Sequence, residues 1–396
     1  MTTPEEKATC KSCSSTNLAV FYRLNGVPVN SCLLFDNRQD AQNYPKGELA
    51  LGFCGNCGFI SNLSFNSQLA RYTEGYEEQQ SFSARFNAFA RDLATRLIER
   101  HDLRNKTVIE VGCGKGDFLL LLCDLGNNRG IGIDPTYVPG RNNGSASERV
   151  TFIRDFYSER YAQYTGEMVC CRHTLEHISD TAAFMQTVRR ALGDKASTIV
   201  FFELPDVERV LRECAFWDIY YEHCSYFSLG SLARLFRRCG FEVTDLAKEY
   251  DGQYLLIEAR PANGNHGLPL KEEETVEDLS KAVAQFQNNY QETVRRWKQK
   301  IETIRETGQR GVIWGSSSKC VAFLNTIGIR DEIEFVVDIN PHRQGKYLPG
   351  SGKLIVAPDF LKEYRPDVVI AMNPIYLDEI RSDLNSLGLH PELTAV

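Results

Sequence analysis

Two short runs in the middle of the chain hold the residue types best suited to acid–base chemistry. Residues 220–226 contain three tyrosines, a carboxylate and a histidine. Such a density is typical of the wall of a binding site, although a polar cluster at an interface would have the same composition. Residues 172–178 add His173 and His177, and histidines act as bases or hydrogen-bond donors near neutral pH. These runs are therefore the first candidates for a reacting centre.

The order of His173, Glu176 and His177 also matches the H-x-x-E-H pattern of some metal sites. That pattern requires a helix that carries both histidines, whereas these residues directly follow a predicted strand. The sequence therefore disfavours a metal ion at this point.

A glycine turn at residues 112–116 predicts a site for a nucleotide-like ligand. The apolar run TVIEV precedes the turn and FLLLLCDLG follows it, which indicates a buried strand and the start of a helix. A second predicted strand, GIGI, ends at Asp134, where a carboxylate can accept both ribose hydroxyls of an adenosine. The glycines Gly112, Gly114 and Gly116 have the spacing G-x-G-x-G, and Glu110 stands just before them.

Two C-x-x-C pairs near the start of the chain predict a metal site. Cys10 and Cys13 form the first pair, and Cys54 and Cys57 form the second, forty residues further on. Two such pairs can turn four thiolates toward one tetrahedral zinc ion and leave no position for water. We therefore expect a structural zinc, with four unligated thiols as the alternative.

The elements that must position these residues alternate between strand and helix from residue 106 to 260. Six strand-like runs (TVIEV, GIGI, TFI, MVCC, TIVFFEL and YLLIEA) alternate with helix-like segments such as 179–192 and 229–239. The pattern predicts an α/β fold with a mostly parallel, doubly wound sheet. Because such sheets bind ligands beyond the carboxyl ends of their strands, the polar residues after each strand are the informative ones.

The last third of the chain predicts a long helix and a further α/β unit. Residues 271–307 carry one apolar seam at steps of mostly three and four, which favours a helix that packs one domain on another. The unit from residue 311 has serines where a dinucleotide fingerprint has glycines, which disfavours a redox cofactor. Backbone amides at that turn can still hold a phosphate.

Composition excludes several classes of partner. The 396-residue chain has a formal net charge of −7, which disfavours nucleic acid and anionic membranes as general partners. The start of the chain has no signal-peptide pattern, and no apolar run approaches the roughly 18 residues of a membrane span. We therefore expect a cytoplasmic protein without disulfides, in spite of its 13 cysteines.

The glycine motif resembles motif I of class I S-adenosylmethionine (SAM)-dependent methyltransferases. The whole chain resembles the three-domain sugar C-methyltransferases, which act on nucleotide-linked 4-keto sugars. The segments that carry this resemblance are CKSC, CGNC, RHTLEHISD, FELPDVERVL, IYYEHCSYFSLGSL and VIWGSSSKC with FVVDINPHRQGKYLPG. It implies a zinc-binding domain over residues 1–70, a Rossmann-like methyltransferase domain over 71–262, and the long helix with a Rossmann-like domain over 263–396.

The resemblance also implies roles for individual residues. His223 would be the catalytic residue; the residues that would assist it are Glu222, Tyr220 and His177, with Tyr72 or Tyr76 closing over the site. SAM would be held by Glu110, the three glycines, Asp134 and His173, and Asp155 and Phe156 would contact its adenine. Asp155 as a surface carboxylate and the two tyrosines as packing residues are the alternatives.

The chemistry fits these residue types. A carbon beside a ketone becomes nucleophilic only after its proton is removed, which needs a base of near-neutral pKa and donors for the enolate oxygen. Two other functions remain open from the sequence: an O- or N-methyltransferase for another small molecule, and a methyltransferase-like binding protein without activity. Intact glycines, Asp134 and His223 argue against the latter.

Overall fold

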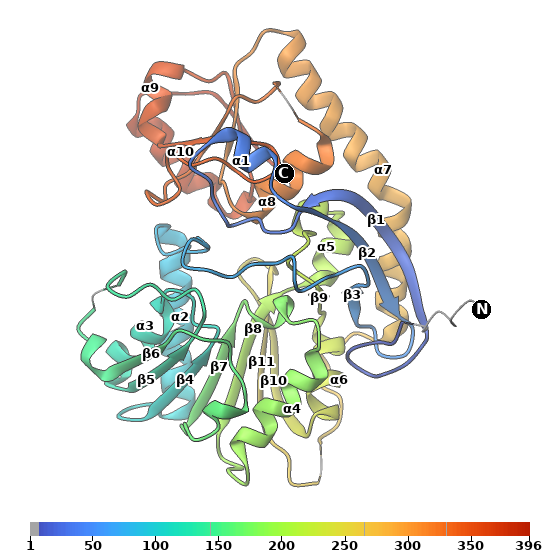
Figure 1. Cartoon of the computed structure of the whole chain (residues 1–396), viewed down its shortest axis with the longest axis vertical. Helices are drawn as coiled ribbons and strands as arrows, with labels where there is room; N and C mark the ends of the chain where they lie inside the picture. Colours follow the sequence, from blue (N-terminus) through green and yellow to red (C-terminus); the bar gives the residue numbers. More distant parts are fainter. Residues whose placement is uncertain (1–7, 143, 265, 330) are drawn as a thin grey trace.

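The computed structural model describes residues 8–142, 144–264, 266–329 and 331–396, and these form three sheets (Figure 1). A four-stranded sheet lies near the start of the chain, a seven-stranded sheet forms the centre, and a five-stranded sheet belongs to the end. Residues 1–7, which contribute to the expectation about a signal peptide, lie outside the described part. None of the helices in the described ranges is long and apolar enough to cross a membrane.

The central sheet has the order β10-β11-β8-β7-β4-β5-β6. Its strands are β4 (Thr107–Val111), β5 (Arg129–Ile133), β6 (Val150–Ile153), β7 (Met168–Arg172), β8 (Ile199–Pro205), β10 (Phe241–Glu249) and β11 (Tyr254–Pro261). The first five are mutually parallel, and β11 runs antiparallel to both β8 and β10. The mostly parallel sheet is confirmed. The sequence reading missed β10, whose alternation of buried and exposed residues marks a half-solvated edge strand.

Helices cover both faces of this sheet. They are α2 (Ala84–His101), α3 (Asp117–Gly126), α4 (Thr181–Leu192), α5 (Val207–Glu213) and α6 (Leu229–Arg238). Alternate residues of β4 point to opposite faces, so Val108 packs with α2 and α3 while Ile109 packs with α4 and α6. The apolar spacing of Phe82, Phe86 and Phe89 in the sequence predicts a helix face that includes Phe82, but Phe82 lies before α2 and is exposed. The Ser83 side chain accepts a hydrogen bond from the Phe86 amide and starts the helix after Phe82.

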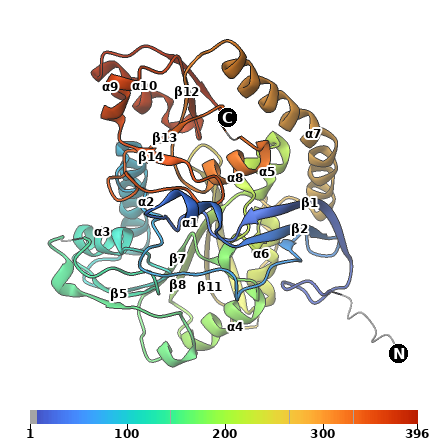
Figure 2. The ribbon, with the colours of Figure 1, turned by 45° about the horizontal axis from the view of Figure 1, so that its top comes forward.

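The first sheet is antiparallel and includes a strand from far along the chain. Its order is β1-β2-β3-β9, with β1 (Leu18–Pro28), β2 (Lys46–Cys54), β3 (Ile60–Asn62) and β9 (Ser225–Tyr226). Between β1 and β2, the short helix α1 (Arg38–Gln42) reaches the C-terminal part, where the Gly350 amide donates to the Ala41 carbonyl at 2.8 Å (Figure 2). Because Ser225 and Tyr226 form β9, the candidate run 220–226 is fixed at its end to the first sheet.

The last sheet is parallel, in the order β14-β13-β12-β15-β16. Its strands are β12 (Gly311–Trp314), β13 (Phe335–Val337), β14 (Leu354–Val356), β15 (Val368–Ala371) and β16 (Glu392–Ala395), and its helices are α8 (Ser318–Ile327), α9 (Leu361–Tyr364) and α10 (Leu377–Ser386). The long helix α7 (Val276–Glu306) runs along one side of the molecule (Figure 1). Leu279 and Phe286 pack with the β1–β2 hairpin, and Trp297 and Ile301 pack with the last sheet, so the predicted apolar seam joins the two.

Candidate active site

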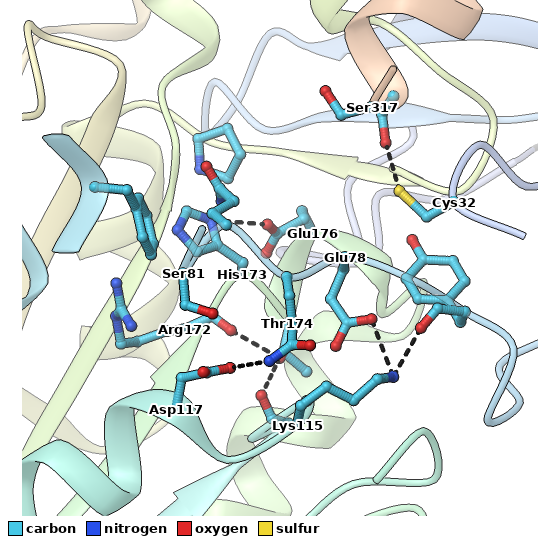
Figure 3. A pocket seen from close by; sticks show the side chains of 18 of the residues that line it. Cys32, Glu78, Ser81, Lys115, Asp117, Arg172, His173, Thr174, Glu176 and Ser317 are labelled. Carbon is cyan, nitrogen blue, oxygen red and sulfur yellow. Dashed lines mark hydrogen bonds and ion pairs between the residues drawn. The ribbon is translucent and has the colours of Figure 1, made fainter. Parts of the chain in front are cut away.

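One cavity of about 630 Å³ is lined by most of the candidate residues (Figure 3). The parts of the chain that line it include the glycine turn after β4, the histidine and tyrosine runs, and the turn after β12 that includes Gly315 and Ser317. Its size is within the usual range for small-molecule sites, about 300–1,000 Å³. The cavity thus brings together residues more than 200 positions apart in the sequence, such as Gly112 and Ser317.

The glycine turn needs its glycines. Gly112, Gly114 and Gly116 have φ angles of 72°, 53° and 89°, in the left-handed region that favours glycine. A Cβ on Gly112 would lie 1.9 Å from the Thr174 hydroxyl oxygen, and one on Gly116 would lie 2.5 Å from the Phe152 ring. Both the backbone angles and the close approach therefore exclude other residues at these positions.

Asp134 follows β5 and fixes the turn that it was predicted to accompany. Its Oδ2 accepts the Gly114 amide at 2.8 Å, and its Oδ1 accepts the Thr136 amide and hydroxyl at 2.6 and 2.7 Å. A carboxylate has about four lone-pair sites, so one remains for a ligand. Asp134 lines the cavity and is 8% exposed, which leaves room for one ribose hydroxyl on this carboxylate rather than for two.

Buried Glu110 and half-buried His173, which line the cavity near the glycine turn, have shifted pKa values. Burial, only partly offset by nearby Arg172, raises the pKa of Glu110 to about 8, and its Oε2 has no hydrogen-bond partner within the described ranges. Burial lowers the pKa of His173, but Glu176 and Glu203 outweigh that effect and raise it to about 9; its Nε2 lies 2.7 Å from Glu203 Oε1. At neutral pH Glu110 therefore holds a proton and His173 is a cation, so His173 is not a free base.

The residues expected at the adenine end are separated. Phe156 lines the cavity with 61% of its surface exposed. The Asp155 carboxylate accepts hydrogen bonds from Arg160 and Tyr161, and it is not among the described residues that line the cavity. Phe156 is thus available to a ligand in the cavity, whereas the Asp155 carboxylate is turned to its own loop.

The second half of the cavity holds two histidines in contact. The ring centroids of His177 and His223 lie 4.7 Å apart, edge to face, and the Tyr220 ring lies 4.1 Å from that of His223. The Tyr72 hydroxyl lies 2.9 Å from His177 Nδ1, and the Tyr72 and Tyr76 rings are 5.4 Å apart. The structure brings together all five of these predicted side chains in one cavity wall.

Burial sets the protonation of this cluster. It lowers the pKa of His223 well below its ordinary value, with a further contribution from the neighbouring His177, so the ring is neutral at pH 7. Burial also raises the pKa of Tyr72, Tyr76 and Tyr220 well above the usual value, with nearby Glu222 adding to the effect, so these phenols keep their protons. The cluster therefore offers an unprotonated imidazole next to hydroxyl donors, and the lowered pKa makes His223 a weaker base than the near-neutral one expected from the sequence.

Glu222 occupies a different place from the one expected. Its carboxylate accepts hydrogen bonds from the Asn30 side chain and the Ser31 amide, both at 3.0 Å, and it is fully buried. Its backbone carbonyl lies 3.1 Å from His177 Nδ1. The carboxylate thus fixes the N-terminal segment behind the cluster, and within the described ranges it makes no hydrogen bond to the His223 ring.

Two cationic groups that were not predicted from the sequence lie near the turn after β12: Lys319 at the start of α8 and Arg209 on α5. Lys319 and Arg209 both line the cavity and both bind the Asp218 carboxylate, Arg209 at 2.5 Å. Arg209 Nε is buried and has no hydrogen-bond partner in the described part of the chain. The run Ser-Ser-Ser-Lys after a predicted strand was the available signal for Lys319, but nothing local to Arg209 indicated its position.

This turn repeats the hydrogen bonding of the glycine turn. Asp338, after β13, accepts the Ser316 amide through Oδ2 at 2.8 Å and the Asn340 amide through Oδ1 at 2.9 Å. The amides of Gly114 and Thr136 bind the two oxygens of Asp134 in the same way. Two similar strand–turn–helix sites therefore open onto one cavity from opposite sides.

The four predicted zinc ligands form a cluster. Cys10 Sγ lies 3.7 Å from Cys57 Sγ, Cys13 Sγ lies 3.6 Å from Cys54 Sγ, and all four sulfur atoms lie within 4.8 Å of one another. A tetrahedron of sulfurs about 2.3 Å from a zinc ion has edges of about 3.8 Å. The arrangement fits a four-thiolate zinc site.

Comparisons with known proteins define first the class and then the family. Residues 82–246 match the model of a methyltransferase domain, and residues 266–388 match that of a C-methyltransferase C-terminal domain. The C-methyltransferase NovU of Streptomyces niveus is 31% identical over 315 residues, which cover 73% of this chain and 72% of that protein. The chain belongs to this C-methyltransferase family and is a SAM-dependent enzyme, so the alternatives of O- or N-methylation and of an inactive protein lose their support.

Solved methyltransferase structures also match the chain. The riboflavin-derivative dimethyltransferase RosA of Streptomyces davawensis is 17% identical, with a TM-score of 0.35 over 45% of this chain and 56% of that one. The 1,6-didemethyltoxoflavin-N1-methyltransferase of Burkholderia thailandensis, solved with S-adenosylhomocysteine, is also 17% identical, with a TM-score of 0.34 over 44% and 79%.

Proposed function

We propose that this C-methyltransferase removes the proton from the carbon beside the ketone of a nucleotide-linked 4-keto sugar and methylates that carbon. The observation that carries the proposal is the placement of the His223, His177 and Tyr220 cluster between two nucleotide-type turns on one cavity. One turn would hold the donor and the other the substrate nucleotide. The sugar would then lie next to the histidines.

The C-terminal turn supports a diphosphate in this position. The amino end of α8, at Ser317 and Ser318, presents backbone amides that favour anions, and Lys319 and Arg209 lie beside it. Asp218 neutralises one of these two charges, which leaves a net positive site in a chain of net charge −7. A nucleoside diphosphate matches the charge of this site.

In the proposed reaction, His223 accepts the proton from the carbon beside the ketone. The C–H electron pair then forms the enolate double bond, and the negative charge moves to the carbonyl oxygen. Tyr220 donates a hydrogen bond to that oxygen. His177 Nδ1 lies 3.1 Å from the Glu222 carbonyl, which can only accept, so the His177 proton resides on Nδ1 and Nε2 keeps a lone pair next to the reacting centre.

The enolate carbon then attacks the methyl carbon of the sulfonium, and the breaking C–S bond leaves its electron pair on sulfur as S-adenosylhomocysteine. His223 passes its proton to solvent, which returns the site to its starting state. The tyrosines Tyr72 and Tyr76 cover the cluster and limit access of water. Holding the enolate carbon in line with the methyl carbon and the sulfur would supply much of the acceleration.

For the donor, we propose that Asp134 accepts one ribose hydroxyl and that Phe156 packs on the adenine. Gly112, Gly114 and Gly116 let the backbone approach the methionine part. Glu110 and His173 line the cavity beside the turn, where His173 binds the carboxylates of Glu176 and Glu203. Asp155 stays a weaker candidate, because its carboxylate is already occupied by Arg160 and Tyr161.

We further propose that Cys10, Cys13, Cys54 and Cys57 bind a structural zinc. The chain then divides into a zinc-binding domain over residues 1–70, a methyltransferase domain over 71–262 and a C-terminal domain over 263–396. Four thiolates leave no open position on the metal, so the zinc would stabilise the hairpin beside the active site and take no part in the reaction.

A direct test is incubation of the purified enzyme with a panel of nucleotide-linked 4-keto sugars and SAM carrying a ¹³C-methyl group. Formation of a new C–CH₃ carbon beside the carbonyl, seen by NMR, is the expected result. Label on oxygen or nitrogen, or no label with any member of the panel, would contradict the proposed substrate class.

A further inference from the structure

The lysine of the glycine turn holds a segment that lies outside the turn. Lys115, between Gly114 and Gly116, has a side chain with no exposed surface. Its ammonium donates to the Tyr76 carbonyl at 2.7 Å and to the Thr136 carbonyl at 2.9 Å, and it lies 3.3 Å from Glu78 Oε2 (Figure 3). A lysine ammonium has three N–H donors, and all three are used here. Lys115 therefore has none left for a substrate.

The first contact reaches the segment of residues 72–80, which we call the tyrosine strap because it carries Tyr72 and Tyr76. The strap crosses the cavity wall, with the Tyr72 hydroxyl at 2.9 Å from His177 Nδ1. At its next residue, Glu77 binds Asn340 at 2.9 Å and Arg141 at 2.5 Å. The strap is thus held by the C-terminal part at Glu77 and by the glycine turn at Tyr76.

The second contact reaches the residue that fixes Asp134. The Thr136 carbonyl accepts from Lys115, while the Thr136 amide and hydroxyl bind Asp134 Oδ1 at 2.6 and 2.7 Å. The buried Lys115 ammonium therefore connects the glycine turn, Asp134 and the tyrosine strap. A shift of the turn when the donor binds would be transmitted to the two tyrosines through this ammonium.

We propose that Lys115 is a positioning residue that couples occupancy of the donor site to the placement of the tyrosine strap over the histidine cluster. The proposal rests on the proposed function only for the role of Tyr72 beside His177. Loss of the ammonium would leave two buried carbonyls unpaired and release the strap from the turn. The donor contacts of the glycine backbone and of Asp134 would largely persist.

Hydrogen–deuterium exchange with S-adenosylhomocysteine tests the coupling without any sugar. In the wild type, saturating S-adenosylhomocysteine should slow exchange at least about fivefold in peptides that cover residues 72–80. In Lys115→Met the strap should exchange at the same rate with and without the ligand, although calorimetry still shows binding within about fivefold of wild type. Lys195→Met, which removes an exposed lysine after α4, should behave as wild type.

Wild-type protein whose strap is not protected by the ligand would overturn the proposal, and this arm needs no variant. Full protection in Lys115→Met would overturn it as well. Steady-state kinetics add a further check once a substrate is available. Lys115→Met should lower kcat about 10- to 100-fold with a smaller change in the KM for SAM, and the effects of Lys115→Met and Tyr72→Phe should be less than additive, whereas additive effects would contradict a shared path.

Discussion

Removal of the Lys319 charge should weaken binding of the nucleotide and leave the donor site unchanged. Lys319 lies at the start of α8, lines the cavity and shares Asp218 with Arg209. In Lys319→Met, Asp218 keeps Arg209 at 2.5 Å, so no buried carboxylate is left unpaired and the fold should persist. A hydrogen bond to a charged group contributes about 1.5–3 kcal/mol, which corresponds to about 10- to 150-fold in affinity.

Calorimetry with a nucleoside diphosphate and with S-adenosylhomocysteine separates the two halves of the cavity. The diphosphate should bind Lys319→Met about 10- to 150-fold more weakly, and S-adenosylhomocysteine should bind within about twofold of wild type. Lys362→Met removes an exposed lysine from the same C-terminal part and serves as the matched control. Unchanged binding of the diphosphate to Lys319→Met, or an equal loss for both ligands, would refute the assignment of this turn to the nucleotide.

Three further predictions concern the four-cysteine cluster, Asp134 and His173. Purified protein should contain about one zinc per chain by mass spectrometry, and Cys54→Ser should lower folding yield and zinc content together; a stable metal-free wild type would contradict the site. Asp134→Ala should weaken SAM binding about 10- to 100-fold by calorimetry, since it removes a charged acceptor and frees the Gly114 amide; unchanged affinity would remove Asp134 from the site. Glu176 and Glu203 raise the pKa of His173 to about 9, so protonated His173 stabilises the fold fully below pH 6.5 and this contribution is lost as the pH rises through 9. The free energy of unfolding, measured by urea titration, should fall over this pH range, and His173→Gln should flatten this part of the profile.

The glycine turn was predictable because its determinants are local. A strand, three glycines at positive φ and an aspartate after the next strand are all encoded within about thirty residues, and the structure has each of them in place. The four cysteines were predictable for a similar reason, since each C-x-x-C pair is a local turn and only the pairing of the two turns is long-range.

The remaining parts depend on contacts between distant residues. Glu222 was expected beside His223 because the two are neighbours in sequence, yet its carboxylate binds Asn30, 192 positions away. The strand β9 pairs with β3 of the first sheet. Arg209 of α5 lines the cavity, where its guanidinium binds the Asp218 carboxylate. A reading of periodicity and motif spacing contains no information on such pairs, because tertiary packing alone decides them.

The central claim, that His223 removes the proton beside the ketone, is tested most directly by an exchange experiment that omits methyl transfer. The enzyme is incubated in deuterated buffer with S-adenosylhomocysteine and a nucleotide-linked 4-keto sugar that it methylates, and deuterium at the carbon beside the ketone is followed by NMR. Wild type and the control His390→Ala, an exposed histidine, should exchange that proton, and His223→Ala should exchange it about 10²- to 10⁴-fold more slowly. Exchange by His223→Ala at the wild-type rate would contradict the account and make His177 the first candidate for the base.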